Sequence, residues 1–157
     1  MILPRGITGF DLGVDAVATA ATVPGLREFR ADCWQVAIRL NAKVENCKTE
    51  KCASFVSHLL VWPDAAIVVL LSNSYPVLAL CQSFQAGTIA FEFVDNARVT
   101  ELFSELGEYD IWTKDTLDLP LKNEMWKELG PSEKRRVKYF RKGVPKRVGD
   151  VVFSHWD

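Results

Sequence analysis

Motifs that would mark a known catalytic chemistry are missing from this sequence. It has no GxSxG nucleophile turn, no GxGxxG dinucleotide fingerprint and no phosphate-binding loop, apart from a lone Val-Gly-Asp near the end. It has only two histidines, His58 and His155. A dyad of His58 with Cys52 or Cys81 would suit a small hydrolase, but no local spacing supports one. We therefore predict that the protein is not an enzyme.

Cysteines are few, and they do not form a metal-binding pattern. Cys47 and Cys52 have four residues between them but lack the second ligand pair that a structural zinc site needs. Cys33 and Cys81 have apolar neighbours and are typical of small core residues. We expect no metal, no cofactor and no disulfide.

Long apolar runs are also lacking. The longest, "DAAIVVLLSN" at residues 64–73, is far too short to cross a bilayer. The opening "MILPRGITGFDLG" has a proline and two glycines within its first nine residues, unlike a signal peptide. These features predict a cytoplasmic protein with no membrane partner, in which the thiols stay reduced.

What the sequence does have is enough apolar material for a folded domain. The chain has 157 residues, of which 48% are hydrophobic and 11% aromatic. This length favours one domain spanning residues 1–157, and the composition excludes a disordered chain.

Charge is distributed unevenly along this domain, although the formal net charge is only −1. Residues 1–121 contain 9 Lys and Arg against 15 Asp and Glu, whereas residues 122–157 contain 10 against 5. The chain therefore divides into an acidic body and a basic C-terminal segment. We expect the two to attract each other within one fold.

The N-terminal part predicts a short strand and then a helix. Ile7 and Phe10 are candidates for an opening strand, followed by a loop up to Pro24. From there to Asn41 apolar residues recur at intervals of three and four, which favours a helix. The spacing of Trp34, Val36, Ile38 and Leu40 also fits strand alternation.

The middle of the chain predicts an antiparallel sheet of four or five strands. "ASFVSHLLVW" (53–62), "AAIVVLLSN" (65–73), "PVLALCQS" (76–83) and "TIAFEFVD" (88–95) are separated by short turns. The second is β-branched and apolar on both faces, so it should be central. In the last, Ile89, Phe91 and Phe93 share one face and Glu92 lies on the other.

Helices are predicted for the rest of the chain, which gives an α+β fold. Asp95 or Asn96 would cap a helix that Gly107 ends. A helical turn follows at residues 125–129, and Ser132 would cap the helix "SEKRRVKYF". Val148, Val151, Val152 and Trp156 again recur at helical spacing.

A run of cations at residues 134–147 raises the possibility of nucleic-acid binding. Its members are Lys134, Arg135, Arg136, Lys138, Arg141, Lys142, Lys146 and Arg147. Such a patch would neutralise phosphates. The cations alternate with apolar residues, however, and an apolar segment follows. The pattern favours a folded helical subdomain with a cationic outer face over a disordered nucleic-acid arm.

The ending "KYFRKGVPKRVGDVVFSHWD" resembles the C-terminal signature of a family of bacterial immunity proteins. The match includes Val148, Gly149, Asp150, Val151, Val152, Phe153, Trp156 and Asp157. The opening "ILPRGITGF" and the middle "IVVLLSNSYPVLAL", leading to "IAFEFVDNARVTELF", resemble the same family in the same order. Phe140 stands where the family usually has a tryptophan, and His155 precedes the final tryptophan.

This resemblance implies a protein that neutralises a co-encoded toxin of a contact-dependent or type VI secretion system. Such proteins bind the toxin and occlude its active site. An acidic body could mimic phosphate toward a basic nuclease cleft, with electrostatic steering of capture.

The candidate toxin-binding residues lie in "SELGEYDIWTKDTLD" and comprise Glu105, Glu108, Tyr109, Asp110, Trp112, Asp115 and Asp118. Aromatic anchors among carboxylates suit a binding surface. The alternative is that Tyr109 and Trp112 pack on the core and that the acids are ordinary solvated charges. A nucleic-acid-associated or scaffold protein using residues 134–147 is the second functional reading.

Overall fold

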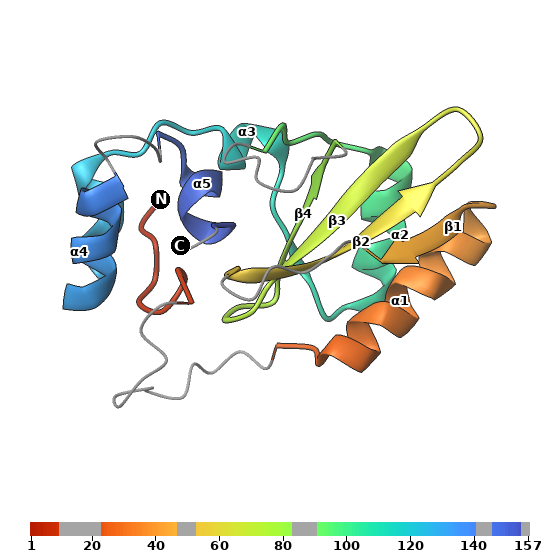
Figure 1. The fold of residues 1–157 in the computed structure, drawn as a ribbon, viewed down its shortest axis with the longest axis horizontal. Helices are drawn as coiled ribbons and strands as arrows, with labels where there is room; N and C mark the ends of the chain where they lie inside the picture. The colour runs from red at the N-terminus through yellow and green to blue at the C-terminus, as the bar shows by residue number, and fades with distance from the viewer. Residues whose placement is uncertain (10–22, 47–52, 83–90, 141–145, 155–157) are drawn as a thin grey trace.

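The computed structural model describes residues 1–9, 23–46, 53–82, 91–140 and 146–154 (Figure 1). It confirms an α+β fold built on one five-stranded sheet with flanking helices. In chain order the elements are α1 (Leu26–Arg39), β1 (Lys43–Asn46), β2 (Phe55–Val61), β3 (Ala66–Ser72), β4 (Val77–Cys81), α2 (Ala97–Leu106), β5 (Asp110–Ile111), α3 (Lys114–Leu117), η1 (Asn123–Trp126), α4 (Pro131–Phe140) and α5 (Val148–Val152).

The sheet has the strand order β1-β2-β3-β4-β5, which confirms β3 as the central strand. Neighbours among the first four strands pair antiparallel, as predicted from the short turns. The two-residue β5 pairs parallel with β4, so the complete sheet is mixed. This direction follows from the intervening α2, because a parallel neighbour is reached by a crossover and not by a hairpin.

Of the strand predicted at residues 88–95, the described residues 91–95 form one antiparallel bridge, between Cys81 and Phe93. Hydrogen bonds on either side join Val94 N to Leu80 O (3.0 Å) and Gln82 N to Glu92 O (2.9 Å). The predicted facing is confirmed for the described residues, since Phe91 and Phe93 are buried and Glu92 is exposed. Ile89 and the Gly87 turn lie outside the described residues.

The opening strand predicted at Ile7 is wrong, because residues 5–8 form a turn. Gly6 has φ of 85° and Gly9 has φ of 69°, in the left-handed region that interrupts an extended strand. Ile7 N donates to Pro4 O, and Gly9 N donates to Gly6 O. Ile7 is nevertheless fully buried. Phe10, the other residue of that prediction, lies outside the described part.

The helical predictions are largely confirmed. The periodic residues after Pro24 form α1, so the strand alternative for that segment is wrong. At α2 the Asn96 side chain accepts a hydrogen bond from Val99 N, and Gly107 ends the helix at φ of 72°. Ser132 is not a cap, because α4 already begins at Pro131. The helical turn predicted near Met125 is the 3-10 helix η1.

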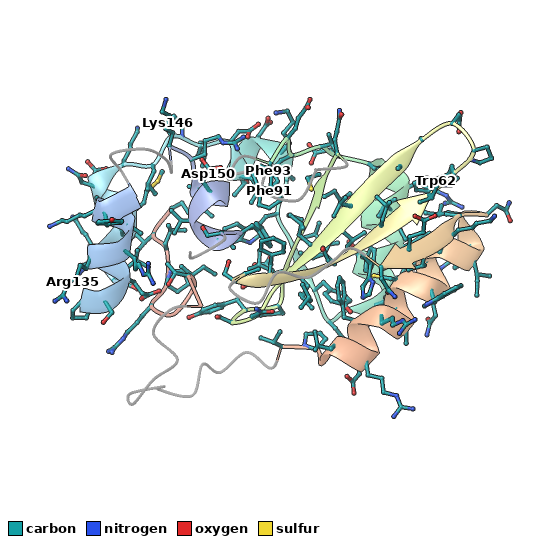
Figure 2. All side chains as sticks on the ribbon, viewed as in Figure 1. Trp62, Phe91, Phe93, Arg135, Lys146 and Asp150 are labelled. Carbon is teal, nitrogen blue, oxygen red and sulfur yellow. The ribbon has the colours of Figure 1, made fainter. Side chains whose placement is uncertain are left out.

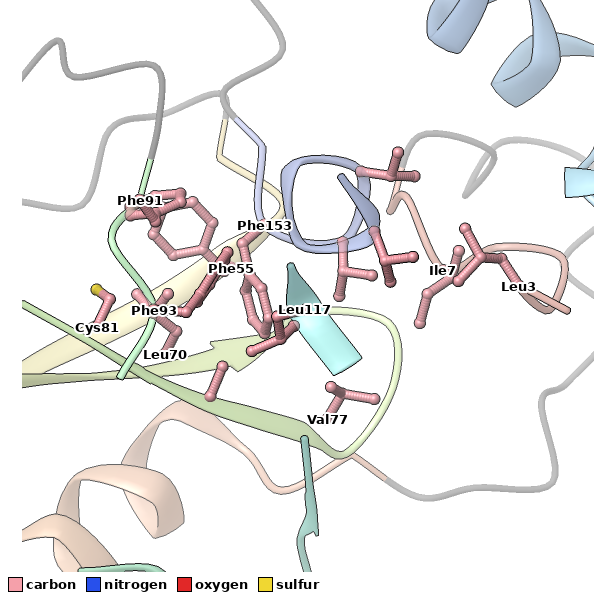
Figure 3. Packing of buried hydrophobic residues seen from close by; sticks show 14 of the residues in the cluster. Leu3, Ile7, Phe55, Leu70, Val77, Cys81, Phe91, Phe93, Leu117 and Phe153 are labelled. Carbon is pink, nitrogen blue, oxygen red and sulfur yellow. The ribbon is translucent and has the colours of Figure 1, made fainter. Parts of the chain in front are cut away.

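Two hydrophobic clusters lie on the two faces of the sheet. Alternate residues of β3 separate between them: Val69 and Leu71 join α1 and α2, whereas Val68 and Leu70 join the C-terminal helices. In Figure 3, Phe55, Phe91, Phe93 and Phe153 gather beside α5 and Leu117. Side chains of the C-terminal segment therefore form one hydrophobic cluster with side chains of the sheet.

Glu133 fastens the N-terminal residues to this C-terminal layer. Its carboxylate is fully buried and accepts hydrogen bonds from Gly6 N (3.0 Å), Thr8 N (3.2 Å), Thr8 Oγ1 (2.6 Å) and Gly130 N (2.7 Å). The last bond also satisfies a backbone donor at the start of α4. Leu3 N donates to Met125 O (2.6 Å) and extends the attachment.

Candidate functional site

The predicted binding segment, residues 105–118, forms one edge of the sheet. Asp110 N donates to Pro76 O (2.8 Å) and Trp112 N donates to Leu78 O (2.9 Å), which fixes β5 along β4. Thr113 then caps the four-residue α3, with its side chain accepting from Thr116 N. Because β5 is the last strand in the order, its outer side borders no other strand of the described sheet.

Strand alternation places the two aromatic candidates on opposite faces of the sheet. Tyr109 and Ile111 pack against the cluster formed with α1 and α2, whereas Trp112 packs against the C-terminal cluster. Both aromatic side chains are half-buried. Tyr109 and Trp112 thus pack on the core, as the alternative interpretation held, and they do not form one aromatic patch.

Tyr109 is held inside its layer by specific contacts. Its hydroxyl donates to Asp32 Oδ2 at 2.5 Å, and its ring meets Phe103 edge-on with the centroids 5.5 Å apart. Burial, with the hydrogen bond to Asp32 as the second cause, strongly raises the pKa of the Tyr109 hydroxyl. Tyr109 therefore connects β5 to α1 and is a structural residue of this face.

Trp112 is oriented by its neighbour on the strand edge. Trp112 Nε1 donates to Asp110 Oδ2 at 2.8 Å. This bond satisfies the only polar atom of the indole and keeps the ring next to an exposed carboxylate. The ring is thus already ordered with its polar edge toward the surface, which lowers the entropy cost of using it as a contact.

The carboxylates of the segment differ in how well their charge is balanced. Glu105 pairs with Arg39 of α1. Asp118 pairs with Lys114 and with Arg147. Burial opposes ionisation of Asp118, but the hydrogen bonds from those two cations outweigh it and lower the pKa of the carboxyl. Glu105 and Asp118 are therefore compensated within the fold.

Three exposed carboxylates of the segment form no ion pair with any described residue: Glu108, Asp110 and Asp115. Together with Trp112 they lie along the chain from just before β5 to the first turn of α3. We call these four residues the acidic edge. Four of the seven predicted residues thus make up the acidic edge. The other three, Glu105, Tyr109 and Asp118, form contacts within the fold.

The basic run of residues 134–147 does not form a uniform outer face. Arg147 is half-buried and donates to Asp118 Oδ1 (2.7 Å), Asp150 Oδ1 (2.8 Å) and the carbonyl oxygen of Phe91 (2.8 Å), with its guanidinium 5.3 Å from the centroid of the Phe93 ring. Arg135, Lys138 and Lys146 are exposed. Figure 2 shows Arg135 and Lys146 pointing outward from the C-terminal layer. Arg141 and Lys142 lie outside the described residues.

Cys81 and His58 do not form a catalytic dyad. Cys81 is buried in the C-terminal cluster, whereas the His58 ring lies 5.3 Å from Phe29 in the cluster on the other face. The sheet separates the two side chains. Cys33 and Cys81 are both fully buried, as expected of small core residues. Cys47, Cys52 and His155 belong to parts of the chain that are not described.

Within residues 1–9, 23–46, 53–82, 91–140 and 146–154, no three His, Cys, Asp or Glu side chains are grouped so that they could hold a metal ion. None of the described helices is both long and apolar enough to span a membrane.

Sequence reasoning missed two features. The buried Glu133 looked like one more charge in a basic helix, although its place two residues after Pro131 is a signal of helix-start capping. The helix α1 also leaves Trp34 and Ile38 exposed, at 45% and 69%. In the sequence, the spacing of these two residues fitted the strand alternative, and nothing in it showed that they lie outside the core.

Comparison of the chain with protein-family models, with curated proteins and with solved structures found no match. The functional argument therefore depends on the site itself.

Proposed function

We propose that this protein binds a cognate toxin protein and neutralises it by occlusion, without catalysis of its own. The observation that carries the proposal is the acidic edge. There Glu108, Asp110 and Asp115 have no ion-pair partner among the described residues, and Asp110 orients the Trp112 ring through a hydrogen bond. An exposed group of like charges costs self-repulsion, and no ion pair among the described residues offsets it. It suits a surface that meets positive charge on another molecule.

The chemistry of this edge fits a basic, phosphate-binding cleft in the partner. Carboxylates would replace phosphate oxygens as acceptors for Arg and Lys, and unscreened negative charge would speed encounter. The half-buried Trp112 would supply the apolar contact that such an interface needs near its centre. The resemblance to immunity proteins of contact-dependent and type VI secretion systems agrees with this binding role.

The experiment that tests the proposal is co-expression with the product of the adjoining gene in a host that this product poisons. We expect growth to be rescued and a one-to-one complex to be recovered. The rate of complex formation should fall steeply as salt is raised, because the attraction is between exposed charges. Absence of both complex and rescue would reject the proposal.

The exposed cations of the C-terminal layer support a second candidate function, association with nucleic acid. Arg135, Lys138 and Lys146 all face solvent. Binding to random-sequence DNA that weakens with salt and is abolished by Arg135→Glu with Lys138→Glu would support this reading. No detectable DNA binding at low salt would reject it.

A further inference from the structure

The opposite edge of the sheet, formed by β1, has its own open side. β1 pairs with β2 on one side only, and no other described strand borders it. An unpaired strand edge presents backbone N–H and C=O groups that can pair with another chain. β1 lies beside α1 at the end of the molecule remote from β5 (Figure 1).

The charges on β1 are self-complementary. Lys43 and Glu45 are both exposed, and within the chain they lie opposite the apolar Val61 and Leu59. Neither therefore has a charged residue directly across from it on β2. If a second β1 ran antiparallel with Val44 facing Val44, each Lys43 would lie opposite Glu45 of the second copy. Opposite charges directly across two strands attract, and the two-fold axis creates this pair twice.

The exposed flank of α1 lies on the same side as this edge. Asp32 and Arg39 reach toward Tyr109 and toward α2. At roughly 100° per residue, Trp34 lies about 160° from Asp32 and about 140° from Arg39 around the helix. Since α2 flanks α1 on one side, Trp34 is on the flank toward β1. Its exposure of 45% leaves a large aromatic surface open to a neighbour there.

We propose that the protein forms a two-fold dimer in which β1 pairs antiparallel with β1 of a second copy in the Val44–Val44 register. The two sheets join into one continuous sheet, and the α1 helices approach each other on one of its faces. Four-residue strands alone bury too little surface for a stable interface, so the Trp34 flank must contribute. A lysine on an edge strand normally discourages pairing, and here Glu45 offsets it only in this register.

A charge-swap series measured by sedimentation velocity over a range of concentrations tests the proposal. The wild type should sediment as a dimer at micromolar concentration. Lys43→Glu places Glu opposite Glu, and Glu45→Lys places Lys opposite Lys, so each should weaken dimerisation about tenfold. The double variant Lys43→Glu with Glu45→Lys restores opposite charges and should regain the dimer. Trp34→Ala should weaken it as well.

Arg98→Glu, a charge reversal on α2, is the matched control. Arg98 is exposed, as Lys43 and Glu45 are, but it lies on the helix over the other end of the sheet. It should leave the dimer unchanged. The thermal midpoints of all variants should show that each is folded. A monomeric wild type, single reversals without effect, or a double variant that stays monomeric would overturn the proposal.

The dimer leaves both acidic edges free, since β1 and β5 are opposite ends of the sheet. The complex with the toxin would then contain two copies of each protein. A monomer that still binds the toxin would overturn the dimer alone, whereas a dimer that binds no toxin would overturn only the proposed function.

Discussion

At the scale of single residues, Arg147 connects several parts of the C-terminal layer. It joins α3, α5 and the Phe91 carbonyl, and its partner Asp150 is only 4% exposed in its side chain. Replacing Arg147 by Met would leave the Asp150 carboxylate without its cation. We expect the free energy of unfolding to fall by about 2 kcal/mol, measured by urea denaturation.

Arg98→Met is the control for that change. Arg98 pairs with Glu101, but both side chains are well exposed, at 62% and 59%. Its removal should change the free energy of unfolding by less than about 0.5 kcal/mol. Equal effects at Arg98 and Arg147 would show that burial of the ion pair is not what makes Arg147 important.

His58 should make stability depend on pH. Burial, with a smaller contribution from the Arg30 charge, lowers the pKa of His58 below 6.5. The unfolded chain therefore binds a proton more readily than the folded protein does, so stability is lost as pH falls below about 6.5. Between about pH 8 and about pH 5 the wild type should lose more unfolding free energy than His58→Gln. Parallel pH profiles of the two would contradict this.

The sequence could predict which residues are apolar and charged, but not which cation turns inward. Arg147 is one of eight cations in residues 134–147, and composition treats them alike. The distinction arises from tertiary structure, because among the described cations of this run only Arg147 pairs with both Asp118 and Asp150. Glu133 was missed for the same reason, since its four backbone and hydroxyl donors come largely from the distant residues Gly6 and Thr8.

At the scale of elements, α5 depends on a close approach at Gly149. A Cβ at this position would lie 2.3 Å from Cε2 of Phe93 and 3.2 Å from the carbonyl oxygen of Leu117. Gly149→Ala should therefore lower the free energy of unfolding by about 2 kcal/mol through overpacking. The measurement is urea unfolding of Gly149→Ala, Phe93→Leu and the double variant. The two changes should be less than additive, because the smaller side chain makes room.

Gly107→Asn is the control, because Gly107 is the uncrowded counterpart of Gly149. Gly107 has φ of 72°, and nothing lies within 4 Å of the position of a Cβ. Asn tolerates this backbone region, so the cost should be well below that of Gly149→Ala. A Gly149→Ala variant as stable as the wild type would show that α5 can shift away from Phe93.

Elements with strong local signals could be predicted, and those defined by pairing could not. The helix α2 has both a capping Asn96 and a terminating Gly107, and β3 is apolar from Ala66 to Leu71. In contrast, β5 has two residues and exists only because β4 offers hydrogen bonds beside it. The short β1 and α3 were missed for a similar reason, since neither has a periodic pattern of its own.

At the scale of the whole molecule, the sequence could not resolve the predicted binding segment into the two faces of the sheet. Tyr109 and Trp112 are three residues apart, and only a strand between them sends their rings to opposite sides. Because β5 was not predicted, the separation of the two rings onto opposite faces could not be predicted either. We propose that the subset Glu108, Asp110, Trp112 and Asp115 contacts the partner.

We propose different roles for the two ends of the sheet. The β5 end presents unbalanced negative charge, and the β1 end presents alternating charge that can pair with itself. Charge of one sign favours a different, positively charged partner, whereas alternating charge in a two-fold register favours a second copy. Binding of the toxin and dimerisation should therefore be separable by mutation.

The central claim is that the acidic edge binds the toxin, and the most direct test is the affinity of the complex measured by calorimetry. Asp110→Lys with Asp115→Lys should weaken binding at least about a hundredfold, because two carboxylates facing cations become two cations. The thermal midpoint should stay nearly unchanged, since both side chains are exposed.

The charge-matched control is Asp64→Lys with Glu124→Lys, two exposed acids outside the acidic edge. The account predicts that this control binds the toxin as the wild type does. Undiminished affinity of Asp110→Lys with Asp115→Lys, or an equal loss in the control, would contradict the account.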